Sequence, residues 1–386
     1  MGEWRKCKLS DIANLNMGQS PKSEFYNQDG MGLPFLQGNR TFGLKYPYFD
    51  TYCTEPKKIA NAGDILFSVR APVGDINIAN TKICIGRGLS AISAKNRNND
   101  FLYFLLHFLK NEIINNESGS VFGSISRTDL GNIKVLYPSL KEQKAIAEVL
   151  SSLDDKIDLL HRQNKTLEEM ASALFRQWFI EEAKDEWEVV KLEDILTITS
   201  SKRIFYSEYV SSGVPFYRSK EIIELHNTGQ TKGELFISEE RYNEIIEKFG
   251  SLTAGDILLT SVGTLGIPYR VSKDDKFYFK DGNLTWFKNF KKLSSLIVFY
   301  WLKSDIGKEE LNAITIGSTQ AALTIKSLKN IQLSLPPKNI IDKLENQLIV
   351  IDDKFQANLK QIKTLENIRN TLLPKLMNGE VRVRYE

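Results

Sequence analysis

Few side chains in this 386-residue sequence have the types and spacings that catalysis or metal binding requires. Its three histidines are scattered: His107 lies in an apolar run where a core role is expected, His161 lies in a helix-like segment, and His226 has no catalytic partner nearby. Neither a G-x-x-x-x-G-K-[ST] phosphate loop nor a G-x-G-x-x-G turn is present. We therefore expect no catalytic residue, no bound metal and no cofactor.

Two Asp-Asp pairs belong to a repeated segment. The repeat is LDDKIDLLHRQNKTLE (153–168) and IDDKFQANLKQIKTLE (351–366), which are identical at half of the aligned positions. Unrelated segments would share only about one or a few. Because both pairs lie in helix-like sequence, we expect solvated or partner-facing carboxylates there and not a metal site.

The repeat extends over nearly the whole chain. In order, the matching segments are WRKCKLSDI (4–12) and WEVVKLEDI (187–195), LPF (33–35) and VPF (214–216), NAGDILFS (61–68) and TAGDILLT (253–260), and GSVFGSISRTDLGNIKVLYP (119–138) and GSTQAALTIKSLKNIQLSLP (317–336). The offset between the copies drifts along the chain, which is typical of homologous halves with different loop insertions.

Each half begins with a β-rich block and continues into a long helix. The runs that predict strands are DILFSV, INIA and IKVLY in the first block, and DILLTSV, LTWF and IQLSL in the second. Apolar stretches at 101–110 and 295–304 predict buried helices that are too short to cross a membrane. The fold class is therefore α+β, with globular domains at 1–138 and 182–337 and spacer helices at 139–181 and 338–379.

Both long helices carry apolar residues at heptad spacing, which is typical of a coiled coil. The first seam is Ile146, Leu150, Leu153, Ile157, Leu160, Asn164, Leu167, Ala171, Leu174 and Trp178. The second seam is Leu344, Leu348, Ile351, Phe355, Asn358, Ile362, Leu365, Arg369, Leu372 and Leu376. The alternative is that each helix packs only on its own domain.

One asparagine interrupts each seam, and the two positions favour an antiparallel pair. In that arrangement Asn164 faces Asn358, whereas a parallel pair would leave each buried amide opposite an aliphatic residue at about 1–3 kcal/mol apiece. We predict that this contact fixes the register and that the structure is pseudo-twofold symmetric; alternatively, each amide faces water at a frayed seam. A seam of about 48 Å would separate the domains by somewhat more than one turn of B-DNA, about 34–36 Å.

Composition narrows the class of protein. The formal net charge is only +3, and residues 1–138 carry the excess of basic side chains, which is weak evidence for nucleic acid. Three cysteines (Cys7, Cys53, Cys84) without a CxxC spacing indicate reduced thiols, and the N-terminus has no apolar signal core. We therefore expect a cytoplasmic protein without a membrane segment.

The repeated motifs resemble the specificity subunits of type I restriction-modification systems. The resemblance is carried by W-x-x-x-K-L-x-D-I twice, G-D-I-L twice, PSLKEQKAIAEVLSSLDDKID (138–158), SVRAPVGDINIA (68–79), GRGLSAI (86–92) and LLPKLMNGEVRV (372–383). The second helix departs from the pattern, because PPKNIIDKLEN lacks the pair that Glu142 and Gln143 supply in the first helix.

This resemblance implies a non-catalytic, DNA-binding subunit. Each globular part would be a target-recognition domain that reads one half of an asymmetric, bipartite site on double-stranded DNA. The helices would set the spacing and dock two methyltransferase (modification) subunits, with restriction subunits added for cleavage. Adenine methylation and ATP-dependent cleavage would then belong to these partners.

Base readout needs polar side chains on loops, and equivalent loops of the two halves supply them. The candidates in the first half are Gln37, Asn39, Arg40, Ser68, Arg70, Arg87, Ser120, Ser124 and Arg127. The candidates in the second half are Arg218, Ser219, Lys220, Thr260, Ser261, Thr264, Lys280, Asn283, Ser318, Thr319 and Gln320. Each could equally be a turn residue or a solvated side chain.

Two other functions fit parts of the sequence. A coiled-coil interaction protein with duplicated ligand-binding domains would show the same repeat, but its exported forms are disfavoured by the cysteines and the N-terminus. A nuclease or methyltransferase fragment is opposed by the missing motifs.

Overall fold

The computed structural model describes residues 4–115, 123–317 and 321–384. The chain forms two compact units, Met1–Arg162 with Lys360–Glu386 (unit 1) and Gln163–Leu359 (unit 2). Each unit contains one β-rich globular part and a stretch of both long helices, so each is described separately below.

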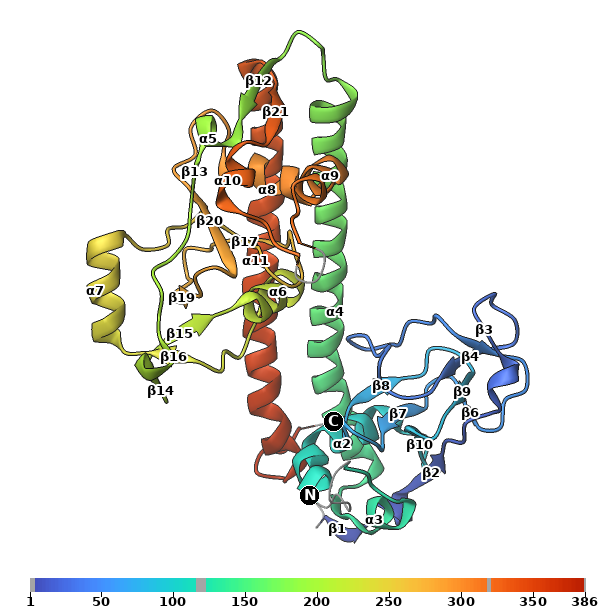
Figure 1. The fold of residues 1–386 in the computed structure, drawn as a ribbon. Coiled ribbons are helices and arrows are strands. Elements are labelled where there is room, and N and C mark those ends of the chain that lie inside the picture. Colours follow the sequence, from blue (N-terminus) through green and yellow to red (C-terminus); the bar gives the residue numbers. More distant parts are fainter. Residues whose placement is uncertain (1–3, 116–122, 318–320, 385–386) are drawn as a thin grey trace. The chain divides into compact units, whose positions relative to one another are not determined.

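Among its described residues, unit 1 contains three small sheets and three shorter α-helices besides its stretches of the long ones (Figure 1). Its elements are β1 (Arg5–Lys8), α1 (Leu9–Ile12), β2 (Ala13–Met17), the 3-10 turn η1 (Ser23–Phe25), β3 (Tyr26–Asn27), β4 (Leu33–Leu36), β5 (Tyr52–Cys53), β6 (Ile59–Ala60), β7 (Ile65–Ser68), β8 (Ile76–Ile78), β9 (Ile83–Ile85), β10 (Leu89–Ala94), α2 (Asn99–Asn115), α3 (Arg127–Asn132), β11 (Lys134–Tyr137) and parts of α4 (Leu140–Arg176) and α11 (Lys338–Met377).

Unit 2 repeats this plan and adds helices to it. Its elements are the rest of α4 and a π-helical turn η2 (Gln177–Glu181), β12 (Glu188–Lys191), α5 (Leu192–Ile195), β13 (Thr197–Thr199), η3 (Tyr206–Glu208), β14 (Tyr209–Val210), β15 (Val214–Tyr217), α6 (Ser219–Thr228), β16 (Phe236–Ile237), α7 (Glu239–Phe249), β17 (Ile257–Thr260), β18 (Pro268–Arg270), β19 (Tyr278–Phe279), β20 (Leu284–Lys288), α8 (Ser295–Lys303), α9 (Asp305–Ala313), α10 (Ile325–Lys329), β21 (Gln332–Leu335) and the first part of α11.

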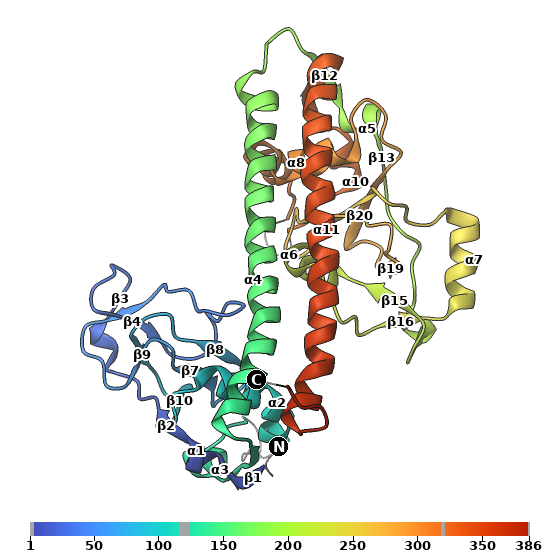
Figure 2. The same ribbon diagram turned by 180° about the vertical axis from the view of Figure 1, so that it is seen from behind.

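The two units share one sheet topology, so the predicted internal duplication is confirmed. A two-stranded ribbon β1-β11 corresponds to β12-β21, and a four-stranded sheet β2-β10-β7-β8 corresponds to β13-β20-β17-β18. The outer sheet β3-β5-β4-β9-β6 corresponds to β14-β16-β15-β19, with the same single parallel pairing inside, β4 with β9 and β15 with β19. In unit 1 this outer sheet lies on the side away from α4 (Figures 1 and 2). All six runs that predicted strands and both runs that predicted buried helices form those elements.

The repeated K-L-x-D-I motif closes the base of each unit in the same way. Asp11 accepts a hydrogen bond from the Lys8 amide at 2.8 Å, and the Lys8 ammonium donates to Asn132 Oδ1 at 2.9 Å. In unit 2, Asp194 accepts from the Lys191 amide at 3.1 Å, and Lys191 donates to Asn330 at 3.1 Å. The lysine therefore ties the first strand of each unit to the turn before the last strand.

The repeated A-G-D-I-L motif is a turn that leads into a buried strand. Gly63 and Gly255 adopt positive φ angles of 86° and 93°, which only glycine adopts readily. The following carboxylates, Asp64 and Asp256, accept hydrogen bonds from backbone amides three residues earlier at 2.8 and 2.9 Å. The strands β7 and β17 that follow are fully buried.

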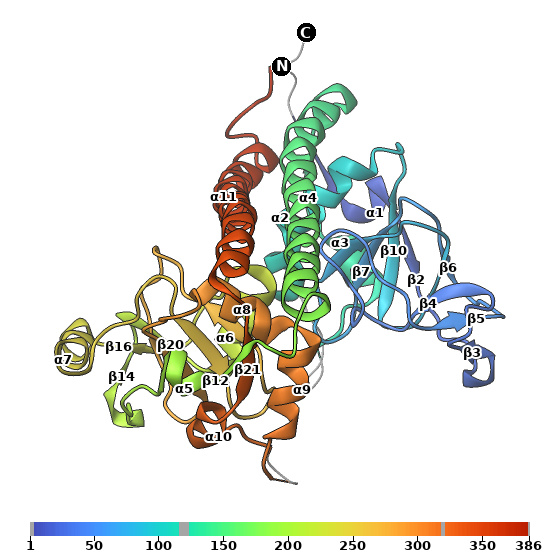
Figure 3. The ribbon, with the colours of Figure 1, turned by 90° about the horizontal axis from the view of Figure 1, so that it is seen from above.

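Unit 2 differs from unit 1 mainly by inserted helices. α6 directly follows β15, and α7 lies beside β16 at the edge of the unit away from α11 (Figures 1 and 3). The expectation that Ser219 and Lys220 lie on a loop is therefore wrong, since they form the first turn of α6, and Arg218, between β15 and α6, is the N-cap of this helix. The Glu221 carboxylate stabilises the N-terminus of this helix, because it accepts a hydrogen bond from the Arg218 amide at 2.8 Å.

The long helices run antiparallel in unit 1. Arg369 of α11 donates to Asp154 of α4 at 2.9 Å, while Leu376, further along α11, packs in the same core as Ile146, further back along α4. The globular part is tied to α4 by Lys45, which donates to Asp155 at 2.7 Å.

Glu142, near the start of α4, joins two other segments of unit 1. Its side chain is 2% exposed and accepts hydrogen bonds from Trp4 Nε1 at 3.1 Å and from Arg382 Nη2 at 2.8 Å. The Arg382 guanidinium also lies over the Trp4 ring, with its Cζ 5.5 Å from the ring centroid. Residues that follow α11 are therefore part of the unit 1 core structure.

The long helices also run antiparallel in unit 2, and a pair of buried amides joins them. Asn358 Nδ2 donates to Asn164 Oδ1 at 2.8 Å, and both side chains are at most 5% exposed. Further from this contact, Lys343 of α11 lies over the ring of Trp178 from η2. Asp352 accepts an ion-pair hydrogen bond from Arg270 of β18, so one aspartate of each repeated pair ties α4 or α11 to the globular part. None of the helices in the described residues is long and apolar enough to span a membrane.

The amide pair uses only part of its hydrogen-bonding capacity, which makes a test possible. Asn164 Nδ2 and Asn358 Oδ1 are buried without a protein partner among the described residues. We expect Asn358→Leu to lower the free energy of unfolding by about 1–3 kcal/mol, because Asn164 then loses its remaining partner. The double variant Asn164→Leu/Asn358→Leu should recover this loss or exceed wild-type stability.

Urea unfolding of the full chain measures both effects. Gln361→Leu, at an exposed position of α11, is the matched control. Equal midpoints for Asn358→Leu and the control would remove the role of the amide pair.

Candidate nucleic-acid interface

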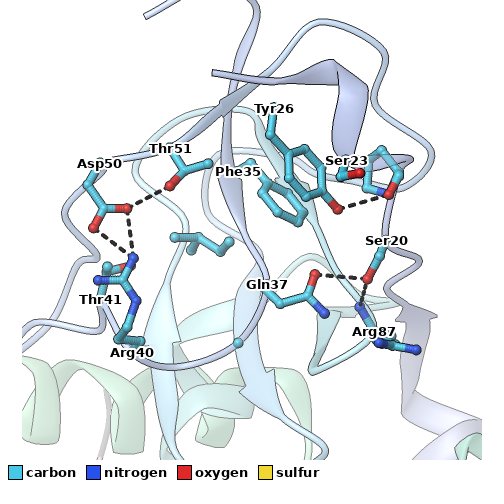
Figure 4. Close-up of a pocket in the computed structure, with 13 residues that line it drawn as sticks. Ser20, Ser23, Tyr26, Phe35, Gln37, Arg40, Thr41, Asp50, Thr51 and Arg87 are labelled. Carbon is cyan, nitrogen blue, oxygen red and sulfur yellow. Dashed lines mark hydrogen bonds and ion pairs between the residues drawn. The ribbon is translucent and has the colours of Figure 1, made fainter. Parts of the chain in front are cut away.

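A pocket of about 570 Å³ with both polar and apolar lining residues lies on the outer sheet of unit 1, where β4 ends and β9 turns toward β10 (Figure 4). We call it the unit 1 pocket, and its lining residues are Ser20, Pro21, Ser23, Tyr26, Phe35, Leu36, Gln37, Gly38, Arg40, Thr41, Asp50, Thr51 and Arg87. Three predicted DNA-binding residues line it, and Arg87, from the turn after β9, is brought beside the segment after β4 that carries Gln37 and Arg40.

Two stacked aromatic rings form one wall of the unit 1 pocket. The rings of Tyr26 and Phe35 stack at 4.5 Å between centroids, and the Tyr26 hydroxyl donates to the Pro21 carbonyl at 2.9 Å. Burial raises the pKa of Tyr26, with Arg87 acting in the opposite direction. The phenol is therefore neutral at physiological pH, and the Arg87 guanidinium lies close enough to affect it.

A short hydrogen-bond chain crosses the pocket from β9 to β4. The Arg87 amide donates to Ser20 Oγ at 3.3 Å, and Ser20 Oγ donates to Gln37 Oε1 at 2.8 Å (Figure 4). The side chains of Gln37 and Arg87 are exposed. The chain therefore orients the Gln37 amide, while the Arg87 guanidinium projects from the turn.

The opposite rim is an ion pair. Arg40 Nη2 donates to both carboxylate oxygens of Asp50, at 2.9 and 2.7 Å, and Thr51 Oγ1 donates to the same carboxylate at 2.9 Å. The hydrogen bonds from Arg40 and Thr51 lower the pKa of Asp50. Arg40 is exposed, so a phosphate could replace Asp50 as its partner in a complex.

The other predicted residues of unit 1 lie outside the lining of this pocket. Asn39 donates to Asp75 at 2.7 Å, and Asp75 also accepts from Lys110 at 3.1 Å. Arg70 is exposed and pairs through its backbone with Ser124. Arg127 is exposed at the first position of α3.

In the corresponding part of unit 2, the basic side chains form ion pairs with carboxylates. The Arg218 guanidinium donates to Glu221 at 2.7 Å and to Glu234 at 3.2 Å, and Lys220 donates to Glu234 at 2.8 Å. Burial would raise the pKa of Glu221, but the hydrogen bonds from Arg218 outweigh it and the pKa is lowered. Arg218 and Lys220 are therefore already paired, unlike Arg87 of unit 1.

The remaining unit 2 candidates line the neighbouring turns. The Asn283 carbonyl accepts from Ser219 Oγ at 3.4 Å and from the Ser261 amide at 2.8 Å. The Lys280 amide donates to the Tyr217 carbonyl at 2.8 Å, and Lys280 is half-buried. Thr264 is exposed between β17 and β18.

Three predicted DNA-binding hydroxyls are buried and stabilise turns, so these predictions need correction. Ser68 is 1% exposed, and its Oγ lies 2.9 Å from the Arg70 carbonyl and 2.6 Å from the Pro72 carbonyl. Thr260 accepts the Ile267 amide at 2.9 Å, and Ser261 lies 2.6 Å from Thr285 Oγ1. Ser68 and Thr260 are the last residues of β7 and β17, and Ser261 follows β17, so the end of the G-D-I-L strand lies inside each unit and not on its surface.

Four further candidates, Ser120, Ser318, Thr319 and Gln320, lie outside the described residues. They stay predictions.

Sequence reasoning missed several residues of these surfaces. Ser20 and Asp50 carry the hydrogen-bond chain and the ion pair of the unit 1 pocket, yet nothing in their immediate sequence marks them. In unit 2, the aromatic side chains of Phe205 and Tyr206 are 60% and 88% exposed. The repeat offers one signal for this region. The turn η3 of unit 2 precedes β14, just as η1 of unit 1 precedes the matching strand β3.

The histidines and paired aspartates away from these surfaces are buried or held in hydrogen bonds and ion pairs within the units. His107 is buried, which lowers its pKa to about 4, and burial likewise lowers the pKa of His226, whose Nδ1 lies 2.7 Å from the Pro268 carbonyl. Within residues 4–115, 123–317 and 321–384, no cluster of three or more metal-ligating side chains occurs. The Asp-Asp pairs form ion pairs with Arg369, Lys45 and Arg270.

Comparison with protein families gives two matches to one model. Residues 1–169 and 184–372 each match the type I restriction modification DNA specificity domain. The matches cover both globular parts and most of both long helices.

Curated relatives and a solved structure are similar along the chain. The type I restriction enzyme MjaIX specificity subunit of Methanocaldococcus jannaschii is 28% identical over 99% of this chain and 94% of its own length. The putative MjaX specificity subunit of the same organism is 45% identical over 43% of this chain, a match that spans only 40% of that relative. The crystal structure of a type I restriction-modification S subunit from M. genitalium has the same fold, with a TM-score of 0.61 at 17% identity and coverage of 97% of this chain and 96% of that one.

The buried hydroxyl at the end of β7 can be tested by its effect on stability. We expect Ser68→Ala to lower the free energy of unfolding by about 1–2 kcal/mol, because two carbonyls of the following turn lose their donor. Ser172→Ala, at an exposed position of α4, should change it by less than about 0.5 kcal/mol. Chemical unfolding of the full-length variants measures the difference, and equal stability of the two variants would contradict a structural role for Ser68.

Proposed function

Because this chain belongs to the type I restriction modification DNA specificity family, we propose that it is the subunit that reads the DNA target of a type I restriction-modification complex. The observation that carries this proposal is the duplicated sheet topology with different side chains at equivalent positions. Two related frameworks with different surfaces suit a bipartite site whose halves differ in sequence.

The two surfaces differ in the side chains that they present and in the partners that hold them. Unit 1 presents an exposed Gln37 and Arg87, whereas Arg218 and Lys220 of unit 2 are paired with Glu221 and Glu234. Free arginine and glutamine side chains are suited to hydrogen-bond base edges in the major groove. We infer that each unit reads one half-site and that the half-sites are not alike.

The long helices fit the role of spacer. We infer that α4 and α11 pair along both units as one antiparallel coiled coil, with the Asn164–Asn358 contact fixing its register and a pseudo-twofold axis relating the halves. In this proposal the helices at 139–181 and 338–379 separate the recognition domains at 1–138 and 182–337, and so set the distance between the half-sites. A polar pair in an apolar seam is a known means of specifying register.

We propose that the chain has no catalytic role of its own. We propose that it binds double-stranded DNA and docks two methyltransferase subunits, which methylate adenine, and restriction subunits, which cleave DNA with ATP. Its relatives are named as specificity subunits, which supports this division of labour. The rival function, a coiled-coil protein with duplicated domains for protein or carbohydrate ligands, has no support from the family. A cytoplasmic location remains a prediction.

Methylation mapping tests the proposed function. Co-expression of the chain with the methyltransferase subunit of its own system, in cells without other adenine methyltransferases, should produce methylated adenines in a split motif. Replacing residues 1–138 by those of a relative should change one side of the motif only, because the other recognition domain is untouched.

Replacing residues 182–337 is the matched control and should change the other side. Methylation that has no split motif, or a motif that changes on both sides after a single exchange, would contradict the proposal.

A further inference from the structure

Two exposed carboxylates hold basic side chains on the surfaces that we propose read DNA. In unit 2, Glu234 Oε1 accepts a hydrogen bond from the Lys220 ammonium at 2.8 Å, and Glu234 Oε2 accepts one from Arg218 Nη2 at 3.2 Å. In unit 1, both oxygens of Asp50 accept from Arg40 Nη2, at 2.9 and 2.7 Å (Figure 4). Arg40 and Arg218 follow the corresponding strands β4 and β15, so the same kind of ion pair occurs at related places in both units.

Glu234 does not belong to the framework that holds unit 2 together. Its side chain is 61% exposed and lies on the loop between α6 and β16. Glu221, the other partner of Arg218, is 2% exposed and also accepts the Arg218 amide at the start of α6. Glu221 therefore keeps Arg218 in place, whereas Glu234 can move away without the loss of a buried contact.

The contacts of Glu234 have the geometry expected for a bound oxyanion. Each carboxylate oxygen meets one cation, as two oxygens of a single phosphate group would. The hydrogen bonds from Lys220 and Arg218 lower the pKa of Glu234, so the carboxylate is charged at neutral pH and competes with any other anion at this place. Lysine and arginine are the side chains that most often bind DNA phosphates.

The Asp50 pair in unit 1 is equally open to exchange. The side chains of Arg40 and Asp50 are both exposed, and the neighbouring Thr51 hydroxyl donates to Asp50 at 2.9 Å. Exposed ion pairs are weak, because water and salt screen the charges. A guanidinium can form two parallel hydrogen bonds with a phosphate, and such pairs are among the stronger ones. A DNA phosphate is therefore able to replace Asp50 as the partner of Arg40.

We propose, on the basis of the proposed DNA-reading function, that Arg218 with Lys220 and Arg40 alone form two binding sites for phosphates of the DNA backbone, and that Glu234 and Asp50 occupy these sites in the free chain. When DNA binds, a phosphate takes the place of each carboxylate. The two carboxylates therefore weaken the binding of every DNA sequence alike, because a phosphate contact carries no sequence information.

DNA binding by the complex of the full chain with the methyltransferase subunit of its own system tests this assignment. The probes are two labelled duplexes of equal length, one with the split motif found by methylation mapping and one without it. Fluorescence anisotropy gives the dissociation constant Kd of each duplex. The wild-type complex should bind both duplexes, and the one with the motif more tightly.

Loss of one carboxylate charge should strengthen binding. We expect Glu234→Gln to lower the Kd of both duplexes about threefold to tenfold at about 50 mM salt, because Lys220 is then free to meet a phosphate. The gain should shrink at about 200 mM salt, because it comes from screened charges. Asp50→Asn should act in the same direction through Arg40.

Two variants serve as matched controls, because each removes one negative charge at an exposed position. Glu247→Gln in α7 is the control for unit 2, and Asp29→Asn is the control for unit 1. Each should change the Kd by less than about twofold, since a charge at a distance is screened. A Lys220→Gln background separates occupation of the site from general repulsion of DNA. In that background Glu234→Gln should lose most of its gain, because coupled residues are not additive.

Each carboxylate is judged against its own control. A Kd equal to that of the control, or a gain from Glu234→Gln that persists in full in the Lys220→Gln background, would overturn the assignment for that site while leaving the proposed function intact. A methylation motif that changes in Glu234→Gln or Asp50→Asn would do the same, because it would show that these groups affect base readout. If the wild-type complex does not prefer the duplex with the split motif, the proposed function fails, and this assignment fails with it.

Discussion

The buried hydrogen bond between Asn164 and Asn358 is the contact that, in our proposal, fixes the register of the helix seam. The surrounding seam positions are aliphatic or aromatic, and such residues tolerate a shift by one heptad with little change in free energy. An amide in that environment does not, because it loses its partner whenever the register changes. In a protein proposed to measure the distance between two DNA segments, a slipped register would be an error in the measured length. In this proposal the polar pair has a role that a better-packed apolar pair could not perform.

In both units, the residues that hold the sheets together are distinct from the residues that form the outer surface. Motifs that recur in both halves, K-L-x-D-I and A-G-D-I-L, make the same hydrogen bonds at the base of each unit and at the entry of its central strand. The residues that differ lie on the outer sheet and the turns beside it, where unit 1 has a pocket and unit 2 has inserted helices and carboxylate-bound cations. Side chains at the surface can therefore change without loss of the hydrogen bonds that hold the sheets. This separation is what a family of readers with different targets needs.

Much of the framework could be predicted from the sequence, because periodicity and repetition carry it. The alternating and apolar runs gave the strands β7 and β17, and the heptads gave the long helices and the facing asparagines. The surface was harder to predict, since the exposure of a polar residue depends on the packing of distant segments. Ser68 and Thr260 look like loop residues in the sequence, but they are the buried last residues of β7 and β17. Ser20 was missed because its partners, Gln37 and Arg87, come from other strands, and α6 was missed because a helix insertion has no counterpart in the first half.

Unit 1 is discontinuous in the chain, with Glu142 and Trp4 on one side of unit 2 and Arg382 on the other. Its core also includes Leu376 and Met377, which follow unit 2 in the chain. During synthesis on the ribosome, all residues of unit 2 emerge before these groups do, so the second half can complete its folding first. The order of completion is thus the reverse of the usual N-terminal-first order. Until then the nascent first half exposes part of its apolar interior, which makes it the natural client of a chaperone.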